Sequence, residues 1–471
     1  MLVDNVKKFL ILLIYIELFD SIYYNKVYGR RKNMNKSKNI ILKLLLINLT
    51  AFTVFSSCDK KNSITEPDGK LDKCTLRFSW WGGDDRHEAT LSAIKLWNEK
   101  YPDIEIKAEY GGWDGWTQKI NTQMAGDNEA DIMQINYDWL ISMSSDGKGF
   151  YDLNKLSDYI DFSEYDDEIL SFGTRNNHLN AITVSMSGRG FFYNSDLYEE
   201  LNFTYPTNWD ELINLGKAFE KHDVYPIDLD IQSGGTAWYL CVVYVQQKTG
   251  KTFIDMNGNL GFDKEDFKTA LDFYSELEEN KVIRTIKDRI DSDGADALYQ
   301  SPAFIDGKIG GVLEWGSSVG KYEAVLDENV LEAGEFLSDE NGNKAGWMIK
   351  PSLMYAISAD TKYPDEAAEF LNFLMSDEEC AKILGTTRGI PANNKIYSYM
   401  EENDMLSGIS YISTEKLNEI MPVTVSPYMD LQQIKDYCNT ALENVSYGKA
   451  STSQAAEQLY TSISEYLEKI K

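Results

Sequence analysis

Residues 74–110 decide the fold, and they read CTLRFSWWGGDDRHEATLSAIKLWNEKYPDIEIKAEY. Apolar and polar side chains alternate over Leu76–Trp80 and again over Ile104–Tyr110, which is the period of a half-buried strand. Between these two segments, the apolar residues of Leu91–Tyr101 recur at helical spacing, and Pro102 ends the helix. The stretch therefore predicts a strand, a helix and a second strand.

The same order of elements continues directly after this stretch. Trp116, Ile120 and Met124 form one helical face that Gly126 closes, and Asp131–Ile135 has the composition of a third strand. An order of strand, helix, strand, helix and strand predicts a parallel sheet with right-handed crossovers.

The rest of the chain also alternates between short strands and helices. The segments expected as strands are Gly190–Tyr193, Gly310–Trp315 and Met354–Ser358. The segments expected as helices are Trp209–Phe219 with Asn208 and Glu211 at its start, one that begins at Pro364, one capped by Ser376 with Glu379, and Ala441–Ile470. We therefore expect an α/β protein of two lobes.

Length and charge exclude several function classes. A chain of 471 residues is too long for one small core and predicts two globular units. It has 46 Lys and Arg against 75 Asp and Glu, which gives a formal net charge of −29. The sequence has no basic stripe to displace counterions from a phosphate backbone, so it argues against nucleic-acid binding.

The N-terminal segment has the pattern of an export signal. Lys36 and Lys38 precede the apolar run Ile40–Phe55, which is shorter than the roughly 20 residues of a membrane span. Two serines then lead directly to Cys58. This order resembles a bacterial lipoprotein signal, in which the cysteine becomes the lipidated first residue.

We therefore expect residues 1–57 to be a signal peptide, with Met34 as a start for it, and residues 58–73 to be a polar, lipid-anchored tether. The expected location is the cell envelope, with the protein anchored to a membrane at Cys58 rather than crossing it. The alternative is a plain secretory peptide with an incidental cysteine.

The other cysteines do not suggest metal or redox chemistry. Cys74, Cys241, Cys380 and Cys438 are far apart in the chain, and no C-x-x-C pair occurs. A disulfide in an exported protein stays open, because sequence alone cannot pair these residues.

One segment resembles a calcium loop in part. Residues 255–261 place oxygen-bearing side chains at alternating positions, but the sixth place is Leu260 instead of glycine and the final glutamate is replaced by Asp266. A hairpin turn around Asn257-Gly258 explains the segment better. We expect neither a metal nor a cofactor.

Aromatic and charged residues gather in the loops that follow the three predicted parallel strands. The loops are residues 80–86, 111–116 and 136–139, and they hold five of the ten tryptophans. Because the carboxyl ends of parallel strands lie at one edge of a sheet, these loops should form one site. Aromatic faces stack on the apolar face of a sugar ring, and charged side chains bind its hydroxyls. The loops therefore favour a carbohydrate ligand.

Each residue in these loops also has a packing interpretation. We expect Trp80 and Trp116 to belong to the core. Arg86 has the alternative of a surface ion pair. The residues that we expect to face the ligand are Trp81, Asp84, Asp85, Trp113 and Trp139.

Seven segments together resemble a known family. They occur in the expected order and are Leu76–Arg86, Ala130–Gln134, Phe192–Leu197, Thr207–Leu212, Phe304–Gly310, Tyr363–Ala368 and Gly389–Ala392. The chain resembles the extracellular solute-binding proteins (family 1) of bacterial ABC sugar transporters, which include maltose- and multiple-sugar-binding lipoproteins.

The resemblance implies a two-lobed, periplasmic-binding-protein-like fold of type II, with a central sheet flanked by helices in each lobe. Residues 74–184 with 352–397 would form the first lobe, and residues 185–351 with 398–471 the second. The hinge would lie near Val184–Gly188 and Lys350–Ser352.

The resemblance also implies ligand contacts from both lobes. In the first lobe, Asp84 and Asp85 match polar contacts, and the loop Tyr137-Asp138-Trp139 matches a stacking and hydrogen-bonding loop. In the second lobe, Glu314-Trp315 matches the place of a stacking tryptophan, and Trp238 and Trp347 lie where loops reach the cleft.

The segment Trp80–His87 is similar to that of proteins that bind oligogalacturonides and related plant-wall oligosaccharides. If the ligand carries a uronate, Arg86 or Arg189 is the expected partner of its carboxylate.

The function that these patterns favour is a monomeric receptor. It would capture an oligosaccharide between its lobes, close about its hinge, and deliver the sugar to the permease of an ABC importer. Two alternatives remain at this stage. One is a glycan-cleaving enzyme, although the family pattern has no catalytic pair, and the other is the same fold binding a polyamine through Asp84, Asp85, Asp114 and Asp138.

Overall fold

The computed structural model describes residues 74–230, 235–294, 296–326 and 330–470. The predicted signal peptide, Cys58 and the tether lie outside the described residues. Within these ranges, no helix has both the length and the apolar character that a membrane crossing requires.

The first five elements have the predicted order. They are β1 (Cys74–Trp81), α3 (Asp84–Lys100), β2 (Ile104–Gly111), α4 (Trp116–Ala125) and β3 (Ile132–Ile135). Strands β2 and β3 both pair with β1 in parallel, so the prediction of a parallel sheet is confirmed. The three loops that follow these strands consequently leave the same edge of the sheet.

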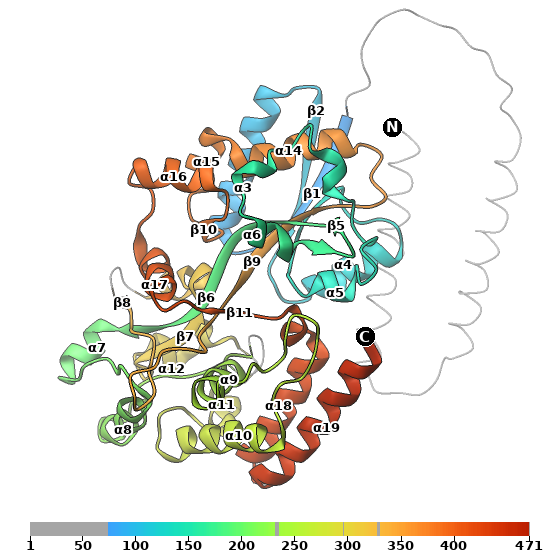
Figure 1. The fold of residues 1–471 in the computed structure, drawn as a ribbon. Helices are drawn as coiled ribbons and strands as arrows, with labels where there is room; N and C mark the ends of the chain where they lie inside the picture. Colours follow the sequence, from blue (N-terminus) through green and yellow to red (C-terminus); the bar gives the residue numbers. More distant parts are fainter. Residues whose placement is uncertain (1–73, 231–234, 295, 327–329, 471) are drawn as a thin grey trace, which may run out of the picture. The chain divides into compact units, whose positions relative to one another are not determined.

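Two long strands extend beyond this sheet. Strand β9 (Met348–Ile357) pairs antiparallel with β3 and with the first half of β6 (Ile182–Asn194). Beyond Gly188, β6 pairs instead with β7 (Gly311–Trp315) and β8 (Leu331–Ala333). Figure 1 shows β6 and β9 running from the part that holds β1 and β2 to the part that holds β7. The predicted strand 190–193 is thus the far half of a longer strand.

We call the elements that pack around β1–β3 the first lobe and those around β7 and β8 the second lobe. The first lobe also contains α5 (Trp139–Ser142), η1 (Leu153–Leu156), η2 (Phe162–Glu164), α6 (Asp167–Phe172), β4 (Thr174–Arg175), β5 (His178–Leu179), α14 (Pro364–Ser376), α15 (Glu378–Leu384), β10 (Ile390–Pro391) and α16 (Asn394–Glu402).

The second lobe is mostly helical. It contains α7 (Ser195–Glu200), α8 (Trp209–Glu220), α9 (Thr236–Thr249), α10 (Lys264–Glu279), α11 (Ile286–Asp293), η3 (Leu298–Gln300), α12 (Pro302–Ile305), η4 (Gly316–Ser318), α13 (Gly320–Glu323), α17 (Gly408–Glu419), β11 (Val423–Thr424), η5 (Pro427–Asp430), α18 (Gln432–Ser446) and α19 (Thr452–Ile470).

Helices cover both faces of the first-lobe sheet. On one face, Phe78 and Trp80 pack with Trp97 of α3 and Phe370 of α14. On the other face, Trp116 and its neighbours on α4 belong to a second cluster. Trp80 and Trp116 are 0% and 3% exposed, which confirms that both are core residues.

The second-lobe core surrounds α9. Residues 236–243 of this helix are all buried, and they pack with α10, α18 and α19. The apolar content of α9 therefore follows from its central position, because a helix that is buried all round needs no polar face.

Two helix boundaries differ from prediction. Asp377, not Ser376, caps α15, and its Oδ1 accepts a hydrogen bond from the Cys380 amide at 2.8 Å. The predicted helix 441–470 is two helices, α18 and α19, because the chain turns at Gly448 with φ 65°. The predicted cap at Asn208 is confirmed, since its side chain accepts a hydrogen bond from the Glu211 amide.

Residues 255–261, which resemble a calcium loop in part, form a turn. Ile254 and Leu260 form an antiparallel bridge, and Gly258 has φ 75°, as a tight hairpin turn requires. Asp255 Oδ1 accepts hydrogen bonds from the amides of Asn257 and Asn259 at 2.8 Å each. This supports the hairpin interpretation.

Gly216→Ala should destabilise the protein. A Cβ at this position in α8 would lie 2.0 Å from the Asn280 carbonyl oxygen and 2.7 Å from the Val282 amide nitrogen. Both are backbone atoms, so the chain after α10 would have to shift. We expect the free energy of unfolding to fall by roughly 1–3 kcal/mol, as measured by urea unfolding.

The matched control is Gly320→Ala in α13, where an added Cβ meets no atom within 4 Å. Its effect should stay within about 1 kcal/mol. Equal losses for the two variants would contradict the steric explanation.

Candidate functional site

Three indole rings from the three loops form one cluster at the edge of the first-lobe sheet. The ring centroids of Trp81 and Trp113 are 5.1 Å apart, and those of Trp81 and Trp139 are 5.6 Å apart. The structure therefore brings together the three tryptophans that the sequence placed at this edge. We call Trp81, Trp113 and Trp139 the indole cluster.

The members of the indole cluster are not equally accessible. Trp113 is 38% exposed, whereas Trp81 and Trp139 are 7% and 1% exposed. Tyr137 is also buried and packs edge-on against Phe172. This differs from the prediction for Tyr137 and Trp139, because both rings fill the core cluster beneath β3 and α4. Of the three rings, Trp113 is the one exposed to solvent, and Trp81 packs against both Trp113 and Trp139.

The charged residues of the first loop have different positions. Asp84 and Asp85 are exposed in the first turn of α3. Arg86 is buried, and its guanidinium donates to the carbonyl oxygens of Thr387 at 2.9 Å and Trp81 at 3.2 Å. Burial and the nearby Arg388 lower the pKa of Arg86 to about 10. Arg86 thus holds the backbone in place. Its burial contradicts the expected surface ion pair, and its contact with the ligand stays a prediction.

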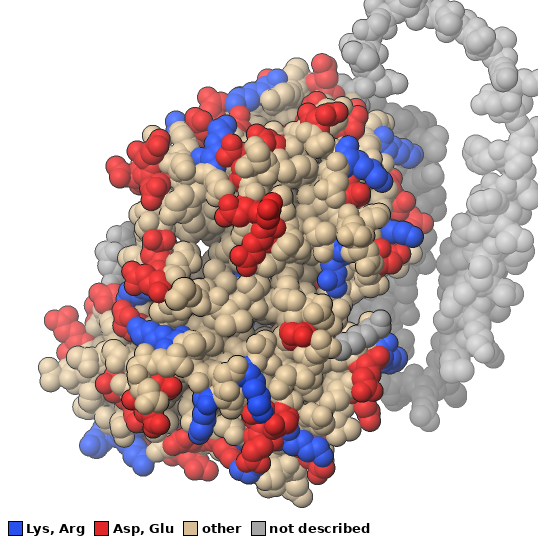
Figure 2. Space-filling model, viewed as in Figure 1, with Lys and Arg blue, Asp and Glu red and all other residues tan. Residues whose placement is uncertain are grey.

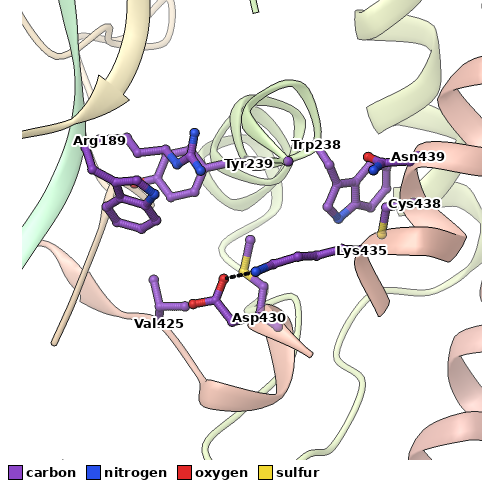
Figure 3. Close-up of a pocket in the computed structure, with 11 residues that line it drawn as sticks. Arg189, Trp238, Tyr239, Val425, Asp430, Lys435, Cys438 and Asn439 are labelled. Atoms are coloured by element: carbon purple, nitrogen blue, oxygen red, sulfur yellow. Dashed lines mark ion pairs between the residues drawn. The ribbon is translucent and has the colours of Figure 1, made fainter. Parts of the chain in front are cut away.

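A small pocket in the second lobe opens to solvent. Arg189 and Tyr239 lie side by side on one side of it and Trp238 on the other, as Figure 3 shows. The pocket is further lined by Gly235, Trp315, Val425, Met429, Asp430, Lys435, Cys438 and Asn439. We call it the cation pocket, because Arg189 and Lys435 line it.

Arg189 reaches the pocket from the crossing strand β6. Its guanidinium lies 4.6 Å from the ring centroid of Trp315 and 5.3 Å from that of Tyr239, and it donates to Thr236 Oγ1. Lys350 of β9 places its ammonium 4.5 Å from the same Trp315 ring. Two cations thus flank one half-buried indole, an arrangement that cation–π attraction stabilises.

Asp430 joins two lysines at the floor of the pocket. Its Oδ2 forms an ion pair with Lys350, and its Oδ1 lies 3.2 Å from Nζ of Lys435. Burial alone would raise the pKa of Asp430, but Lys350 and Lys435 outweigh burial and hold it well below its usual range. Asp430 is therefore an anion at all physiological pH values.

Asp138 faces this cluster from the first lobe. It is 9% exposed, and its Oδ1 accepts a hydrogen bond from Asn136 Nδ2 at 2.5 Å. Burial raises the pKa of Asp138 to about 6, although Lys435 and Lys350 oppose part of this rise. The protonation of Asp138 therefore changes close to neutral pH.

Three further predicted residues lie in the second lobe. Trp238 lines the cation pocket, where its ring is 4% exposed and stacks on Phe267. Glu314 is buried and pairs with Lys321 at 2.8 Å. Trp347 is 0% exposed and donates to the Leu337 carbonyl oxygen at 3.0 Å. The prediction that Trp347 reaches the cleft is wrong, because its ring packs inside the second-lobe core.

Several residues of the pocket were not predicted. Tyr239 lies on an apolar helix, and Asp430 and Lys435 belong to a segment without a recognisable motif. The sequence predicted Lys350 as a hinge residue and not as a neighbour of the pocket. No sequence signal marks these residues. A buried charged side chain is rare, but its burial is visible only in the folded structure.

Comparison with known families identifies the fold and its role. The sequence model of the bacterial extracellular solute-binding proteins matches residues 83–379. The chain belongs to this family. Its fold is accordingly the two-lobed fold of these proteins, with β6 and β9 joining the lobes.

Solved structures of similar proteins agree with this assignment. A periplasmic oligogalacturonide-binding protein from Yersinia enterocolitica, in complex with saturated digalacturonic acid, is 31% identical, with a TM-score of 0.80. The similarity covers 84% of this chain and 99% of that one. A periplasmic solute-binding protein from Pectobacterium atrosepticum is 30% identical, with a TM-score of 0.79 over 84% and 99% of the two chains.

A de novo designed cysteine esterase is also similar, at 30% identity and a TM-score of 0.72 over 85% of this chain and 100% of that one. The esterase activity is a property of that designed protein. Since function resides in the site and not in the fold, this similarity assigns no catalysis to the present chain.

Asp138→Asn should make stability less dependent on pH. Because folding raises the pKa of Asp138 above its usual 3.8, the ionised carboxylate destabilises the fold, and this cost grows as the pH rises towards 6 and above. Between about pH 4.5 and pH 7.5, the variant should gain roughly 2 kcal/mol over the wild type in free energy of unfolding.

Urea unfolding at the two pH values measures this gain. Asp167→Asn, which removes an exposed carboxylate from the first turn of α6, is the control and should show no such gain. A gain of equal size in both variants would show that the buried position of Asp138 has no effect.

Proposed function

We propose that this protein is the receptor of an ABC importer and captures an acidic oligosaccharide of the pectin type. The observation that carries the proposal is the group of Arg189, Lys350 and Lys435 around one pocket with Trp315. Guanidinium and ammonium groups beside an aromatic face suit a uronate, which has a carboxylate on a sugar ring.

The group of cations around the pocket is unusual, because the protein as a whole is strongly acidic. Acidic side chains are spread over the face shown in Figure 2, and the chain carries a formal net charge of −29. A random surface of such a protein would repel an acidic sugar. The cation pocket brings Arg189 and Lys435 together on this acidic chain, which supports selection for an anionic ligand.

The similar proteins support the same ligand class. The protein from Yersinia enterocolitica binds oligogalacturonides, and its similarity extends over most of this chain. In the present structure, Trp113 supplies an exposed aromatic face in the first lobe, and the cation pocket supplies charge in the second. A short oligosaccharide between them would contact both lobes.

The crossing strands support capture by closure. The pairing of β6 with β9 is irregular around Ser185, where the register shifts on both sides. Ser185 also contacts Ser352 and the Arg388 carbonyl oxygen through its hydroxyl. We place the hinge at residues 184–188 and 350–352, so that the lobes close over the sugar before delivery to the permease.

The two alternatives fit the pocket less well. A polyamine would meet Arg189, Lys350 and Lys435, which repel a cation. A glycan-cleaving enzyme needs two carboxyl groups set about the scissile bond, whereas the family and the similar proteins are solute-binding proteins. Capture without cleavage is the function that the site favours.

Calorimetric titration with oligogalacturonides tests the ligand. We expect binding of digalacturonate or trigalacturonate, and weaker binding of their methyl esters and of neutral maltose oligomers. Lys435→Gln should weaken binding of the acidic sugars roughly tenfold, because it removes one cation from the pocket.

Lys362→Gln is the control for charge, because Lys362 is exposed and outside the pocket. It should leave the affinity unchanged. Equal affinity of the wild type for acidic and esterified sugars would contradict the role of the cation pocket.

We also propose that Cys58 carries a lipid that anchors the receptor to the membrane. The supporting observation is the sequence Phe55-Ser56-Ser57-Cys58 after an apolar run of signal-peptide length. In bacteria that express the full chain, Cys58→Ala should move the protein from the membrane fraction to the soluble exported fraction. Retention of the variant in the membrane fraction would contradict a lipid on this cysteine.

A further inference from the structure

Asp138 is a buried acid without a cationic partner of its own. Its side chain is almost fully buried, yet it forms no ion pair within 4.0 Å with any residue that the structure describes. Its side chain accepts a hydrogen bond from Nδ2 of Asn136. Carboxylates are rarely buried in this way unless they are paired, so the position calls for a physical explanation.

The cations that face Asp138 are already occupied. Lys435 on α18 and Lys350 on β9 lie near it, but both pair with the two oxygens of Asp430 on η5. Arg189 on β6 lines the same pocket and directs its guanidinium towards Thr236 and Trp315. The carboxylate of Asp430 is thus directly paired with these lysines, whereas that of Asp138 is not.

The contact between the lobes fixes Asp138 in this place. Helix α5, which follows Asp138 directly, packs against η5, and Ile141 of α5 belongs to the second-lobe core. Asp138 therefore cannot turn to solvent without separating these elements. A negative charge that enters the pocket therefore repels the carboxylate of Asp138.

We infer that capture of an acidic sugar is coupled to the uptake of one proton, and that Asp138 is the group that takes it. This inference rests on the proposed function. When a ligand carboxylate binds among Arg189, Lys350 and Lys435, it adds negative charge close to Asp138. The unpaired carboxylate then accepts a proton from solvent on one of its oxygens and becomes a neutral carboxylic acid, which removes its repulsion with the ligand carboxylate.

The coupling has a consequence for affinity. Proton uptake on binding means that the receptor binds acidic sugars more tightly as the pH falls from 8 to about 6. The carboxylate of the ligand itself titrates at about 3.5, as ordinary carboxyl groups of this type do, so it stays ionised across this range. The pH dependence therefore belongs to the protein.

Calorimetry of the full chain with digalacturonate tests the inference. Titrations near pH 7 in phosphate and in Tris, whose heats of ionisation differ, give the number of protons exchanged on binding. We expect an uptake of roughly 0.3–1 proton for the wild type and for the control Asp167→Asn. Asp138→Asn should still bind the sugar, with no proton uptake.

A second variant keeps the carboxylate and changes its surroundings. Asn136→Ala removes the hydrogen bond to Asp138 Oδ1, which stabilises the ionised form. The pH at which affinity begins to fall should therefore move upward, whereas a merely structural role of Asn136 would lower the affinity equally at every pH.

The outcomes separate the two proposals. No binding of digalacturonate at any pH would refute the proposed function. Binding without proton exchange in the wild type would overturn the coupling alone. Proton uptake that persists in a folded Asp138→Asn variant would assign the proton to another group and would overturn the role of Asp138.

Discussion

The pairing of β6 with β9 is the constraint on which the site depends. These two strands belong to both lobes, and each delivers a cation to the pocket next to the point where it crosses. Arg189 directly follows Gly188 on β6, and Lys350 pairs with Ser187 across the ladder. The hinge and the charged part of the site are therefore built from the same backbone. A change in the angle between the strands would move the guanidinium and the ammonium together, and this joins the recognition of a ligand to the position of the lobes.

Electrostatics explains why this pocket can be both buried and charged. Ion pairs in a protein interior are tolerated when each charge has a partner with good geometry. Asp430 fulfils this requirement for Lys350 and Lys435, and Trp315 stabilises Arg189 and Lys350 through its ring. Asp138 is the exception in this arrangement, because it is buried near the cations without direct pairing. Local violations of the pairing rule are expected where a protein has a function to perform.

The sequence predicted the order of the first strands and helices, but only part of the candidate site. Strict periodicity located β1, α3, β2, α4 and β3, and the edge rule for parallel strands brought Trp81, Trp113 and Trp139 together. Which ring would be exposed could not be predicted, because the exposure of Trp139 depends on helices that pack over it from other parts of the chain. Asp430 and Lys435 were missed for a related reason. They reach the pocket from a segment far from the motifs, and no local pattern marks a lysine that tertiary contacts bring to a pocket.

The order of the chain has a consequence for folding. Arg189 and Trp315 lie in the middle of the sequence, but the acid and lysine that complete the pocket lie on η5 and α18, which follow both crossing strands. The sheet of the first lobe is also incomplete until β9 has formed, because β9 pairs with both β3 and β6. A fragment that ends before η5 therefore has no complete pocket, and ligand recognition requires nearly the whole chain.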